Sequence, residues 1–184
     1  MIQFTTPRLC VRMFRQDDAA ALAEYRSDPE VARYVPWGPP YSIEKASDMI
    51  GRMAGRDFYN CGDTGLNMAV ERHSDHQLIG EAMIKHDHGD PRQGIIGYAL
   101  ARKFHGRGFG AELTRGLIDR FFAAEESHRA TAYCDARNIA SIRVLEKVGM
   151  RLEAEFRRGV FAKGEWVDER VYALLREEWT GARR

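Results

Sequence analysis

The sequence lacks a cysteine framework. It holds only three cysteines, Cys10, Cys61 and Cys134, and no two of them have the CxxC spacing of a zinc or redox site. An odd number of widely spaced thiols is typical of a reducing compartment rather than of a disulfide-bonded secreted domain. We therefore expect a cytoplasmic protein in which the cysteines pack as small apolar side chains.

Long apolar runs and an excess of charge of one sign are also missing. No stretch approaches the roughly 20 apolar residues that span a bilayer, and residues 1–12 carry Thr, Pro and Arg where a signal peptide is apolar. The formal net charge is +1, which gives no overall attraction to nucleic acid or to an anionic membrane. The composition therefore argues against both kinds of partner.

The elements that are present predict an α+β fold, with one central mixed sheet flanked by helices in a single domain over residues 1–184. Apolar alternation predicts the strands, and the helical period predicts the helices. The expected strands cover residues 9–13, 66–70, 78–84, 95–100 and 130–134, with a closing hairpin turned at Lys163-Gly164. The expected helices start at Asp17 or Asp18, at Asp28, at Ser42 and near Gly108, and a last one covers 139–148 and ends at Gly149.

A glycine-rich turn lies between the expected strand 95–100 and the long helix. Its sequence is Gly106-Arg107-Gly108-Phe109-Gly110, and Ala111-Glu112 follow. Alternate glycines let several main-chain N–H groups converge on an anion at a helix N-terminus, so the turn predicts a diphosphate site. A P-loop would need Lys-Ser/Thr after the glycines, and a Rossmann turn would follow the first strand of a βαβ unit. The alternative reading is a tight strand-to-helix turn that binds nothing.

A second motif, Asn138-Ile139-Ala140-Ser141, opens the helix that ends at Gly149. Together with the glycine turn, it resembles the GNAT superfamily of N-acetyltransferases, and more closely its RimJ/RimL branch, which acetylates the N-terminal amines of ribosomal proteins. The likeness also includes the segments 6–12, 28–31, 36–37, 96–100 and 164–179, so it covers most of the chain. The order of these pieces makes the resemblance specific.

The resemblance implies a GNAT-like acyl-CoA N-acyltransferase fold with a mostly antiparallel sheet, and acetyl-CoA as cosubstrate. In the family the turn reads Gln/Arg-x-x-Gly-x-Gly/Ala, and here Gly108 and Gly110 match while His105 stands in the first position. The match carries over the main-chain amides that hold the diphosphate, but not a side-chain role for His105. The implied cofactor-binding residues are Tyr98, Ala99, Leu100, His105, Gly106, Arg107, Gly108, Phe109, Gly110, Ala111, Asn138 and Ser141.

The resemblance also implies that the strand through Tyr98 separates from the strand through Tyr133, which opens a wedge for the pantetheine arm. Asn138 would contact that arm, and Ser141 would donate a proton to the departing thiolate. Asn138 is also a good helix cap and Ser141 can serve local backbone groups in the first turn, so a capping role is the alternative for each. The two roles are compatible.

The acceptor amine must lose a proton, and the two carboxylates that the family often uses for this step are missing. Their positions hold Ile95 and Val160. Glu81, inside an apolar strand, is the first candidate for the base, with an outward-facing strand carboxylate as the alternative. The other candidates are Asp135, Glu153 and Glu155. Direct transfer is expected, rather than a two-step route through an acylated Cys134.

Three aromatic residues, Tyr34, Trp37 and Tyr133, are expected at the acceptor site, beside the closing hairpin near Phe161 and Trp166. Aromatic side chains in such a place can flank an aliphatic amine or a peptide. They can equally be hydrophobic cover for the core.

The sequence as a whole predicts an N-acetyltransferase that moves an acetyl group directly from acetyl-CoA to a primary amine, either a protein N-terminus or a small molecule. A catalytically weak acyl-CoA-binding sensor is the alternative, because the family carboxylates are missing. The polar segment 86–90 offers donors for a metal but no third well-spaced ligand, so no metal is expected. A monomer and a homodimer are both compatible with the sequence.

Overall fold

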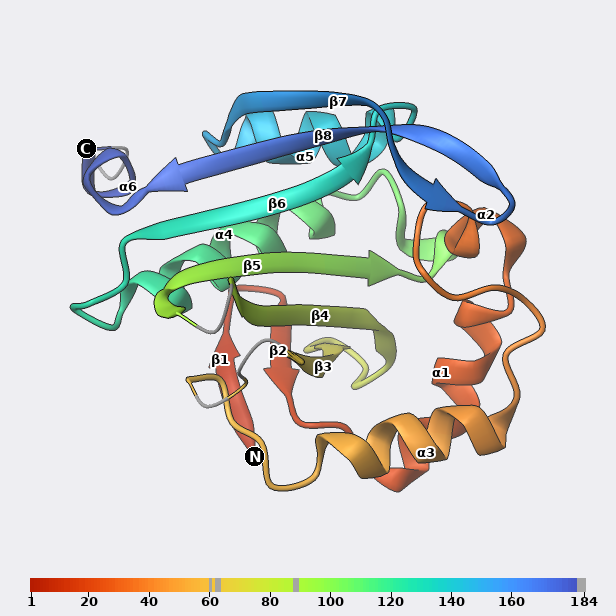
Figure 1. The fold of residues 1–184 in the computed structure, drawn as a ribbon. Helices are drawn as coiled ribbons and strands as arrows, with labels where there is room; N and C mark the ends of the chain where they lie inside the picture. The colour runs from red at the N-terminus through yellow and green to blue at the C-terminus, as the bar shows by residue number, and fades with distance from the viewer. Residues whose placement is uncertain (60, 62–63, 88–89, 182–184) are drawn as a thin grey trace.

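A computed structural model of the chain describes residues 1–59, 61, 64–87 and 90–181. Its strands form one 8-stranded sheet in the order β1-β2-β3-β4-β5-β6-β8-β7, with helices on both faces (Figure 1). Neighbouring strands in the described residues are antiparallel, except that β5 and β6 run parallel. The predicted α+β fold with a mixed, mostly antiparallel sheet is confirmed.

The elements follow the predicted order along the chain. The strands are β1 (Ile2–Thr5), β2 (Leu9–Arg12), β3 (Leu66–Arg72), β4 (Leu78–Asp87), β5 (Asp90–Leu100), β6 (Arg129–Asp135), β7 (Arg151–Ala162) and β8 (Glu165–Leu175). The helices are α1 (Ala19–Arg26), α2 (Pro29–Ala32), α3 (Ile43–Met53), α4 (Phe109–Phe122), α5 (Ile139–Lys147) and α6 (Arg176–Gly181). Two short 3₁₀ turns, η1 (Gln16–Asp18) and η2 (Arg102–Phe104), precede α1 and α4.

Local hydrogen bonds and backbone conformations define the ends of several helices. The Ser42 hydroxyl accepts a hydrogen bond from the Lys45 N–H at 3.2 Å and caps α3, and the Asp28 carboxylate accepts from the Glu30 N–H at 2.9 Å and caps α2. Gly149 follows α5 with φ 92°, a left-handed conformation that favours glycine. These capping predictions are confirmed.

The first helix starts where the sequence predicts, with Asp18 as the N-cap residue, but the expected side-chain cap is not formed. Residues 16–18 form the 3₁₀ turn η1, and α1 begins at Ala19. The Asp18 carboxylate does not cap α1, because it forms a buried ion pair with Arg12 at 2.7 Å and accepts a hydrogen bond from the Arg15 N–H. The first strand, β1, was not predicted at all. It pairs only with β2, so it is an edge strand.

The closing hairpin turns at Lys163 and Gly164, as predicted. Both residues have positive φ, 50° and 86°, which is the backbone twist that a two-residue turn between antiparallel strands requires. β7 and β8 extend from this turn, and β8 also pairs with β6 in the middle of the sheet. The hairpin therefore continues the sheet beyond β6.

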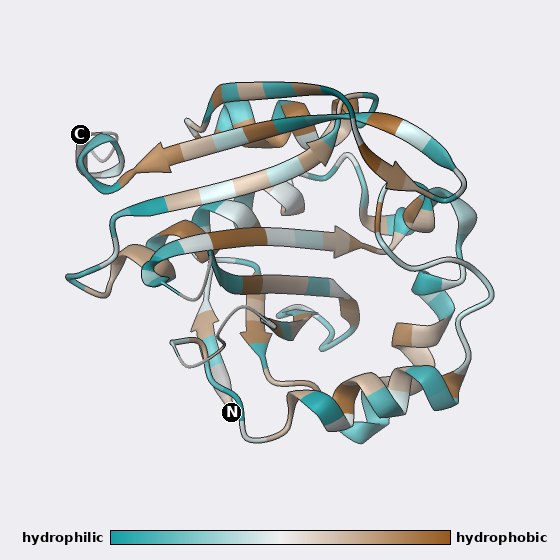
Figure 2. Ribbon diagram, viewed as in Figure 1, coloured by the Kyte–Doolittle hydropathy of each residue, from teal (hydrophilic) through white to brown (hydrophobic). Residues whose placement is uncertain are grey.

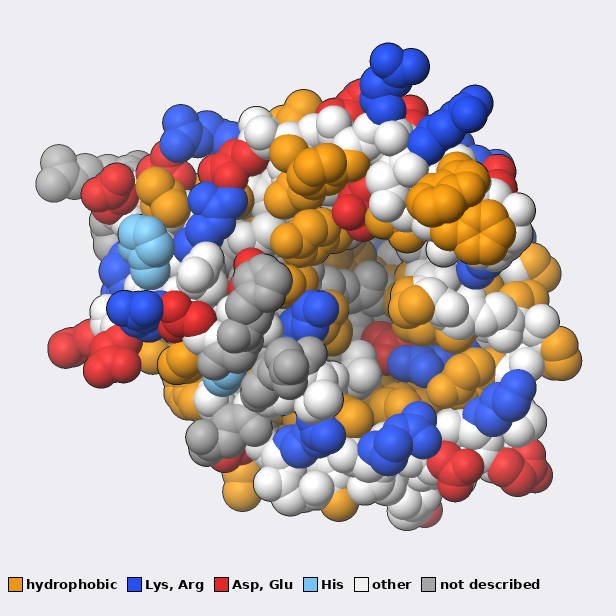
Figure 3. Space-filling model, in the orientation of Figure 1, with side chains coloured by type: hydrophobic (Ala, Val, Ile, Leu, Met, Phe, Trp, Pro, Cys, Tyr) orange, Lys and Arg blue, Asp and Glu red, His pale blue; other side chains and the backbone are white. Residues whose placement is uncertain are grey.

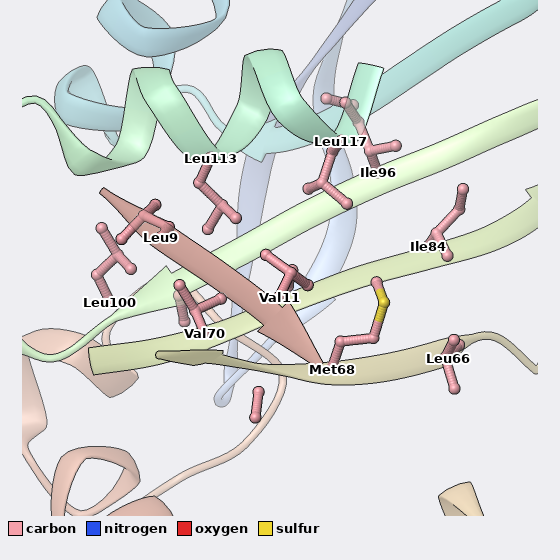
Figure 4. Packing of buried hydrophobic residues seen from close by; sticks show 14 of the residues in the cluster. Leu9, Val11, Leu66, Met68, Val70, Ile84, Ile96, Leu100, Leu113 and Leu117 are labelled. Carbon is pink, nitrogen blue, oxygen red and sulfur yellow. The ribbon is translucent and has the colours of Figure 1, made fainter. Parts of the chain in front are cut away.

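Helices α4 and α5 cover one face of the sheet, the α4 face, whereas α1 lies against β4 on the opposite face, the α1 face (Figure 1). Leu113 and Leu117 of α4 are buried above Leu9 of β2 and Ile96 of β5 (Figure 4). Apolar residues are concentrated along the central strands, while polar and apolar residues alternate along α3 (Figure 2). Because side chains alternate along a strand, Ile96 on the α4 face places Gly97 on the α1 face.

The three cysteines are buried and free, as expected. Among the helices of the described residues, none has the length and apolar character that a bilayer span requires.

Candidate functional site

Strands β5 and β6 separate along their length. Their parallel pairing covers only Gln93, Gly94 and Ile95 of β5, yet β5 continues to Leu100 and β6 continues to Asp135. The remainder of each strand pairs only with its outer neighbour, β4 or β8. The two strands therefore diverge and leave a wedge between them (Figure 1). The predicted separation of these strands is confirmed.

The main chain of β5 has hydrogen-bonding groups directed into this wedge. The Ala101 N–H donates to the Ile79 carbonyl at 2.8 Å, which fixes the residues that face β4. In an antiparallel ladder the residues alternate, so the main-chain groups of Ala99 are directed to β4 and those of Tyr98 and Leu100 are directed to the wedge. The β5 side of the wedge, which we call its wall, therefore has main-chain donors and acceptors that an extended ligand can bind.

The glycine turn, residues 105–110, joins this wall to α4. Gly106 and Gly108 have φ values of 72° and 80°, and the first helical hydrogen bond runs from the Glu112 N–H to the Gly108 carbonyl at 3.1 Å. No acceptor within the described residues receives the N–H groups of residues 106–111. These N–H groups and the positive end of the α4 dipole make an anion site beside the wedge.

Arg8, which the sequence analysis did not select, holds the glycine turn from outside. Its guanidinium donates to the Arg107 carbonyl at 3.0 Å and to the Glu112 carboxylate at 2.6 Å, and it lies 4.4 Å from the centre of the Phe109 ring. Burial would raise the pKa of Glu112, but hydrogen bonds from Thr6 and Arg8 outweigh it and lower this pKa. Arg8 thus compensates a carboxylate that would otherwise repel an anion at the turn.

His105 supports the turn instead of facing a ligand. One of its ring nitrogens, Nε2, lies 2.8 Å from the Leu100 carbonyl oxygen, at the end of β5. Gly110 lies close to the wedge wall, because a Cβ on this residue would sit 3.0 Å from the Tyr98 hydroxyl oxygen. Among the glycines of the turn, the two that match the family pattern are thus the ones with close neighbours, since a Cβ on Gly106 would meet nothing within 4 Å.

Asn138 caps α5, since its side-chain oxygen accepts a hydrogen bond from the Ser141 N–H at 3.1 Å. The Ser141 hydroxyl itself forms no hydrogen bond with a described residue, and its side chain is half-buried. The capping interpretation is confirmed for Asn138. The Ser141 hydroxyl is left free for another partner.

Glu81 lies on the α1 face, opposite Ala99 in the ladder, and its exposed fraction is only 2%. The alternative of an outward-facing strand carboxylate is therefore wrong. Arg26 of α1 binds both carboxylate oxygens, with 2.9 Å between Nε and Oε1 and a second contact to Oε2. The Arg26 guanidinium is covered in turn by the rings of Trp37, at 4.0 Å, and Tyr41, at 4.9 Å. Glu81 is thus a buried carboxylate with both oxygens bound to Arg26.

The other carboxylates that the sequence suggested as bases also have arginine partners. The ion pairs are Asp135–Arg137 at 2.7 Å, Glu155–Arg170 at 2.6 Å, and Glu153–Arg129. The hydrogen bond from Arg137 is the main reason that the pKa of Asp135 is lowered. All four candidates therefore have an arginine beside them.

Glu169 of β8 was missed by the sequence analysis. It lies opposite Asp135 on one side and Phe156 on the other, and it is half-buried. No ion pair or hydrogen bond joins its carboxylate to another residue in the described part of the chain, and burial raises its pKa. Nothing in the sequence indicates this difference, because Glu169 stands next to Asp168 and Arg170 in an ordinary polar stretch.

The expected acceptor segments do meet. The Lys163 ammonium at the hairpin tip contacts the Ala32 carbonyl of α2, next to the loop that carries Tyr34 and Trp37. Trp37 is half-buried, packs against the core and covers Arg26, and its indole N–H has no hydrogen-bond partner among the described residues. Tyr133 is 44% exposed. Figure 3 shows a hollow on this side of the molecule beside the end of β5.

The hairpin aromatics lie outside this cover. Phe161 and Trp166 are exposed and pack against each other with ring centres 5.4 Å apart. Their rings are therefore open to solvent on the closing hairpin.

No group of three metal-ligating side chains is present among the described residues. His88 and Gly89 of the polar segment lie outside those residues. His86 is buried, and burial lowers its pKa.

The chain matches a family model over residues 8–151, the acetyltransferase (GNAT) domain. Among curated proteins, it is 32% identical over 178 residues to the uncharacterized N-acetyltransferase YnaD of Bacillus subtilis, covering 97% of this chain and 99% of that protein. It is 26% identical to the [ribosomal protein uS5]-alanine N-acetyltransferase of Escherichia coli, covering 99% and 95% of the two chains.

Solved structures show the same fold. An acetyltransferase of the GNAT family from Bacillus anthracis superimposes with a TM-score of 0.84 at 29% identity, covering 97% of this chain and all of that one. The RimJ protein of Mycobacterium smegmatis in complex with CoA-disulfide has a TM-score of 0.79 at 24% identity, covering 92% and 83% of the two chains.

Proposed function

The chain belongs to the GNAT acetyltransferase family and transfers an acetyl group to an amine, and from this premise we propose that acetyl-CoA binds along the wedge with its diphosphate on the glycine turn. The free N–H groups of residues 106–111 carry this proposal. An anion with several oxygens is the partner that such converging donors require. The GNAT fold uses acetyl-CoA, which supplies both this anion and the acetyl group.

We assign the cofactor contacts by the same geometry. The main chain of Tyr98 and the N–H of Leu100 face the wedge and would hydrogen-bond the amides of the pantetheine arm. Asn138, whose side chain caps α5 at the opposite wall, would contact the same arm. The free Ser141 hydroxyl, in the first turn of α5, would donate a proton to the departing thiolate.

Direct transfer from acetyl-CoA to the amine fits the chemistry of the wedge. Burial raises the pKa of Cys134 to about 11, so its thiol is rarely ionised at neutral pH. A thiol in this state is a poor nucleophile for an acyl-enzyme route. The amine itself therefore attacks the thioester carbonyl carbon.

We further propose that the acceptor is the α-amine of a protein chain in the cytoplasm. An α-amine has a pKa of about 7.7–8.0, so a useful fraction is already neutral near pH 7, whereas a lysine amine near 10.4 is almost fully charged. The exposed Phe161 and Trp166 suit a polypeptide that extends out of the hollow. The ribosomal-protein acetyltransferase among the relatives acts on an acceptor of this class.

A panel experiment tests the proposal. Purified protein is incubated with acetyl-CoA and with N-terminal peptides, lysine side-chain amines or small polyamines, and release of the CoA thiol is followed. We expect turnover to be fastest with peptides that have a free α-amine, and the same peptides with an acetylated N-terminus to be inert. Tight CoA binding without turnover on any amine would instead support an acyl-CoA-binding sensor.

A further inference from the structure

We propose that Glu169 takes the proton from the acceptor amine, and that Glu81 is a positioning residue that holds α1 and the Trp37 loop on the sheet. This inference rests on the proposed acetyl transfer and deepens it by naming the base. It departs from the expectation that Glu81 is the base.

The sheet register places Glu169 on the α1 face at the wall of the wedge. Ile95 of β5 is paired with Thr131 of β6, and alternation along β6 puts Tyr133 and Asp135 on the same face as Thr131. Glu169 pairs with Asp135 across the next ladder. Neighbouring strands lie about 4.8 Å apart, so Glu169 stands one strand away from the free edge of β6.

Glu81 lies on the same face of the sheet, on the other side of the wedge, in β4. It pairs with Ala99, which lies on the α1 face of β5. The two carboxylates therefore face the wedge from its two sides, β4 and β8. They differ in exposure and in surroundings, because Glu81 is 2% exposed and bound to Arg26 whereas Glu169 is half-buried.

The surroundings of Glu169 favour proton uptake. Its ladder neighbours on the same face are Asp135, an acid whose own charge is compensated by Arg137, and Phe156, which is apolar. Tyr133 lies diagonally opposite Glu169 on β6, and the charge of Arg33, which follows α2, helps to lower the pKa of Asp135. The cations in this region are thus directed to Asp135, and Glu169 has no counter-ion among the described residues.

The surroundings of Glu81 oppose the same role. Both of its oxygens are bound to Arg26 in a site with 2% exposure, so neither oxygen is free to contact an amine. Breaking one side of a buried pair leaves an uncompensated charge, which is costly. Glu81 therefore holds the Arg26 guanidinium in place, and this guanidinium contacts Trp37 and Tyr41.

The step balances as follows. The amine nitrogen forms a bond to the thioester carbonyl carbon, and the C–S bond breaks to give acetylated amine and CoA thiolate. The proton lost by the amine passes to the Glu169 carboxylate, through one water if the two are not in contact. Ser141 supplies a proton to the thiolate and takes one back from solvent, and Glu169 releases its proton to solvent before the next turnover.

The direction of the pH dependence follows from burial. A half-buried carboxylate without a cation is ionised only above the ordinary glutamate pKa of about 4.3, and burial raises the pKa of Glu169 further. The base works in its ionised form. The rate at saturating substrates should therefore fall on the acidic side as Glu169 becomes protonated.

The test compares Glu169→Gln, Glu81→Gln and Glu153→Gln, the last as a control for loss of an exposed strand carboxylate. For each variant we would measure kcat against pH with an N-terminal peptide, CoA affinity by calorimetry, and the melting temperature. We expect Glu169→Gln to lower kcat by about 100-fold and remove the acidic limb, with CoA affinity and melting temperature unchanged. Glu169→Asp should recover part of the rate and the limb.

Glu81→Gln should show the opposite pattern: a lower melting temperature and a higher KM for the peptide, with the acidic limb retained. An acidic limb that survives in Glu169→Gln, or one that disappears in a stable Glu81→Gln, overturns the assignment of the base. If wild-type protein turns over no amine, the proposed function fails, and this inference fails with it.

Discussion

Main-chain groups form one side of the wedge, and side chains form the other. The cofactor side consists of main-chain N–H groups at residues 106–111 and main-chain edges of β5, with one ion pair behind the turn. The α1 side consists of side chains, chiefly the buried Arg26–Glu81 pair and the aromatic rings above it. A ligand on the first side is recognised by backbone geometry, which tolerates many side chains. On the second side, recognition of a ligand would depend on side chains, which a single substitution can replace.

This difference predicts where stability and where binding are sensitive to mutation. A change at the buried pair should affect folding most, because it leaves a charge without a partner. A change in the glycine turn should affect CoA affinity most, because it alters the path of the backbone. The following experiments test this separation in order of decreasing expected effect.

Glu81→Ala should have the largest effect on stability. It leaves the Arg26 guanidinium buried without a counter-ion, which typically costs about 3–5 kcal/mol, and Arg26 is as buried as Glu81. Urea unfolding measures the loss. Glu153→Ala, in an exposed pair with Arg129, should cost no more than about 1 kcal/mol. Equal losses of unfolding free energy in the two variants would contradict a larger contribution from the buried pair than from the exposed pair.

Gly108→Val should weaken CoA binding by roughly 100-fold, about 2.7 kcal/mol. The φ of 80° is unfavourable for valine, and the new side chain would obstruct the N–H groups of the turn. Gly164→Val is the matched control, since this residue has φ 86° in the closing hairpin. Both variants should lose similar stability, about 1–2 kcal/mol. Calorimetry with CoA should show lost affinity only for Gly108→Val; equal affinities would place the diphosphate elsewhere.

Ser141→Ala should lower kcat by about 10- to 100-fold, with little change in CoA affinity. The cap of α5 comes from Asn138 and survives this change, so the melting temperature should hardly move. Asn138→Ala removes this cap and should lower the free energy of unfolding by about 1 kcal/mol. A Ser141→Ala protein with normal turnover and a lowered melting temperature would return Ser141 to a purely structural role.

The smallest expected effect is the pH dependence of the ion pair behind the glycine turn. Thr6 and Arg8 lower the folded-state pKa of Glu112 below its ordinary value of about 4.3. Their contribution to stability is therefore present above that value and lost as pH falls through the lower folded-state pKa. The pair is partly exposed, so roughly 1 kcal/mol or less is expected. Urea midpoints between pH 6 and pH 3 should converge for wild type and Glu112→Gln; parallel curves would contradict this.

The cofactor side could be predicted from the sequence because its determinants are local. Positive φ at Gly108, the cap at Asn138 and the start of α4 are each encoded within a few residues. The strand separation is non-local, and it came from the family resemblance rather than from any feature of β5 or β6 alone. The alternating apolar pattern also predicted correctly that Glu81 is buried.

The α1 side could not be predicted in the same way. Arg26 is 55 positions from Glu81, and nothing near either residue indicates that they pair. For the same reason the sequence does not distinguish Glu169, without a partner, from Glu155, whose partner is Arg170 on the neighbouring strand. Trp37 was expected to face an acceptor, but the guanidinium beneath it could only be found in three dimensions.

The separation of β5 from β6 has a thermodynamic consequence for the whole chain. A sheet with an unpaired interior edge exposes amides that a folded protein normally protects, so the amides of Tyr98 and Leu100 should exchange hydrogen quickly in the free protein. A pantetheine arm in the wedge would act as a missing strand. Mass action then couples folding to the acetyl-CoA pool, because ligand at 100 times its Kd adds about 2.7 kcal/mol. The protein would be longest-lived in the cell when its own substrate is abundant.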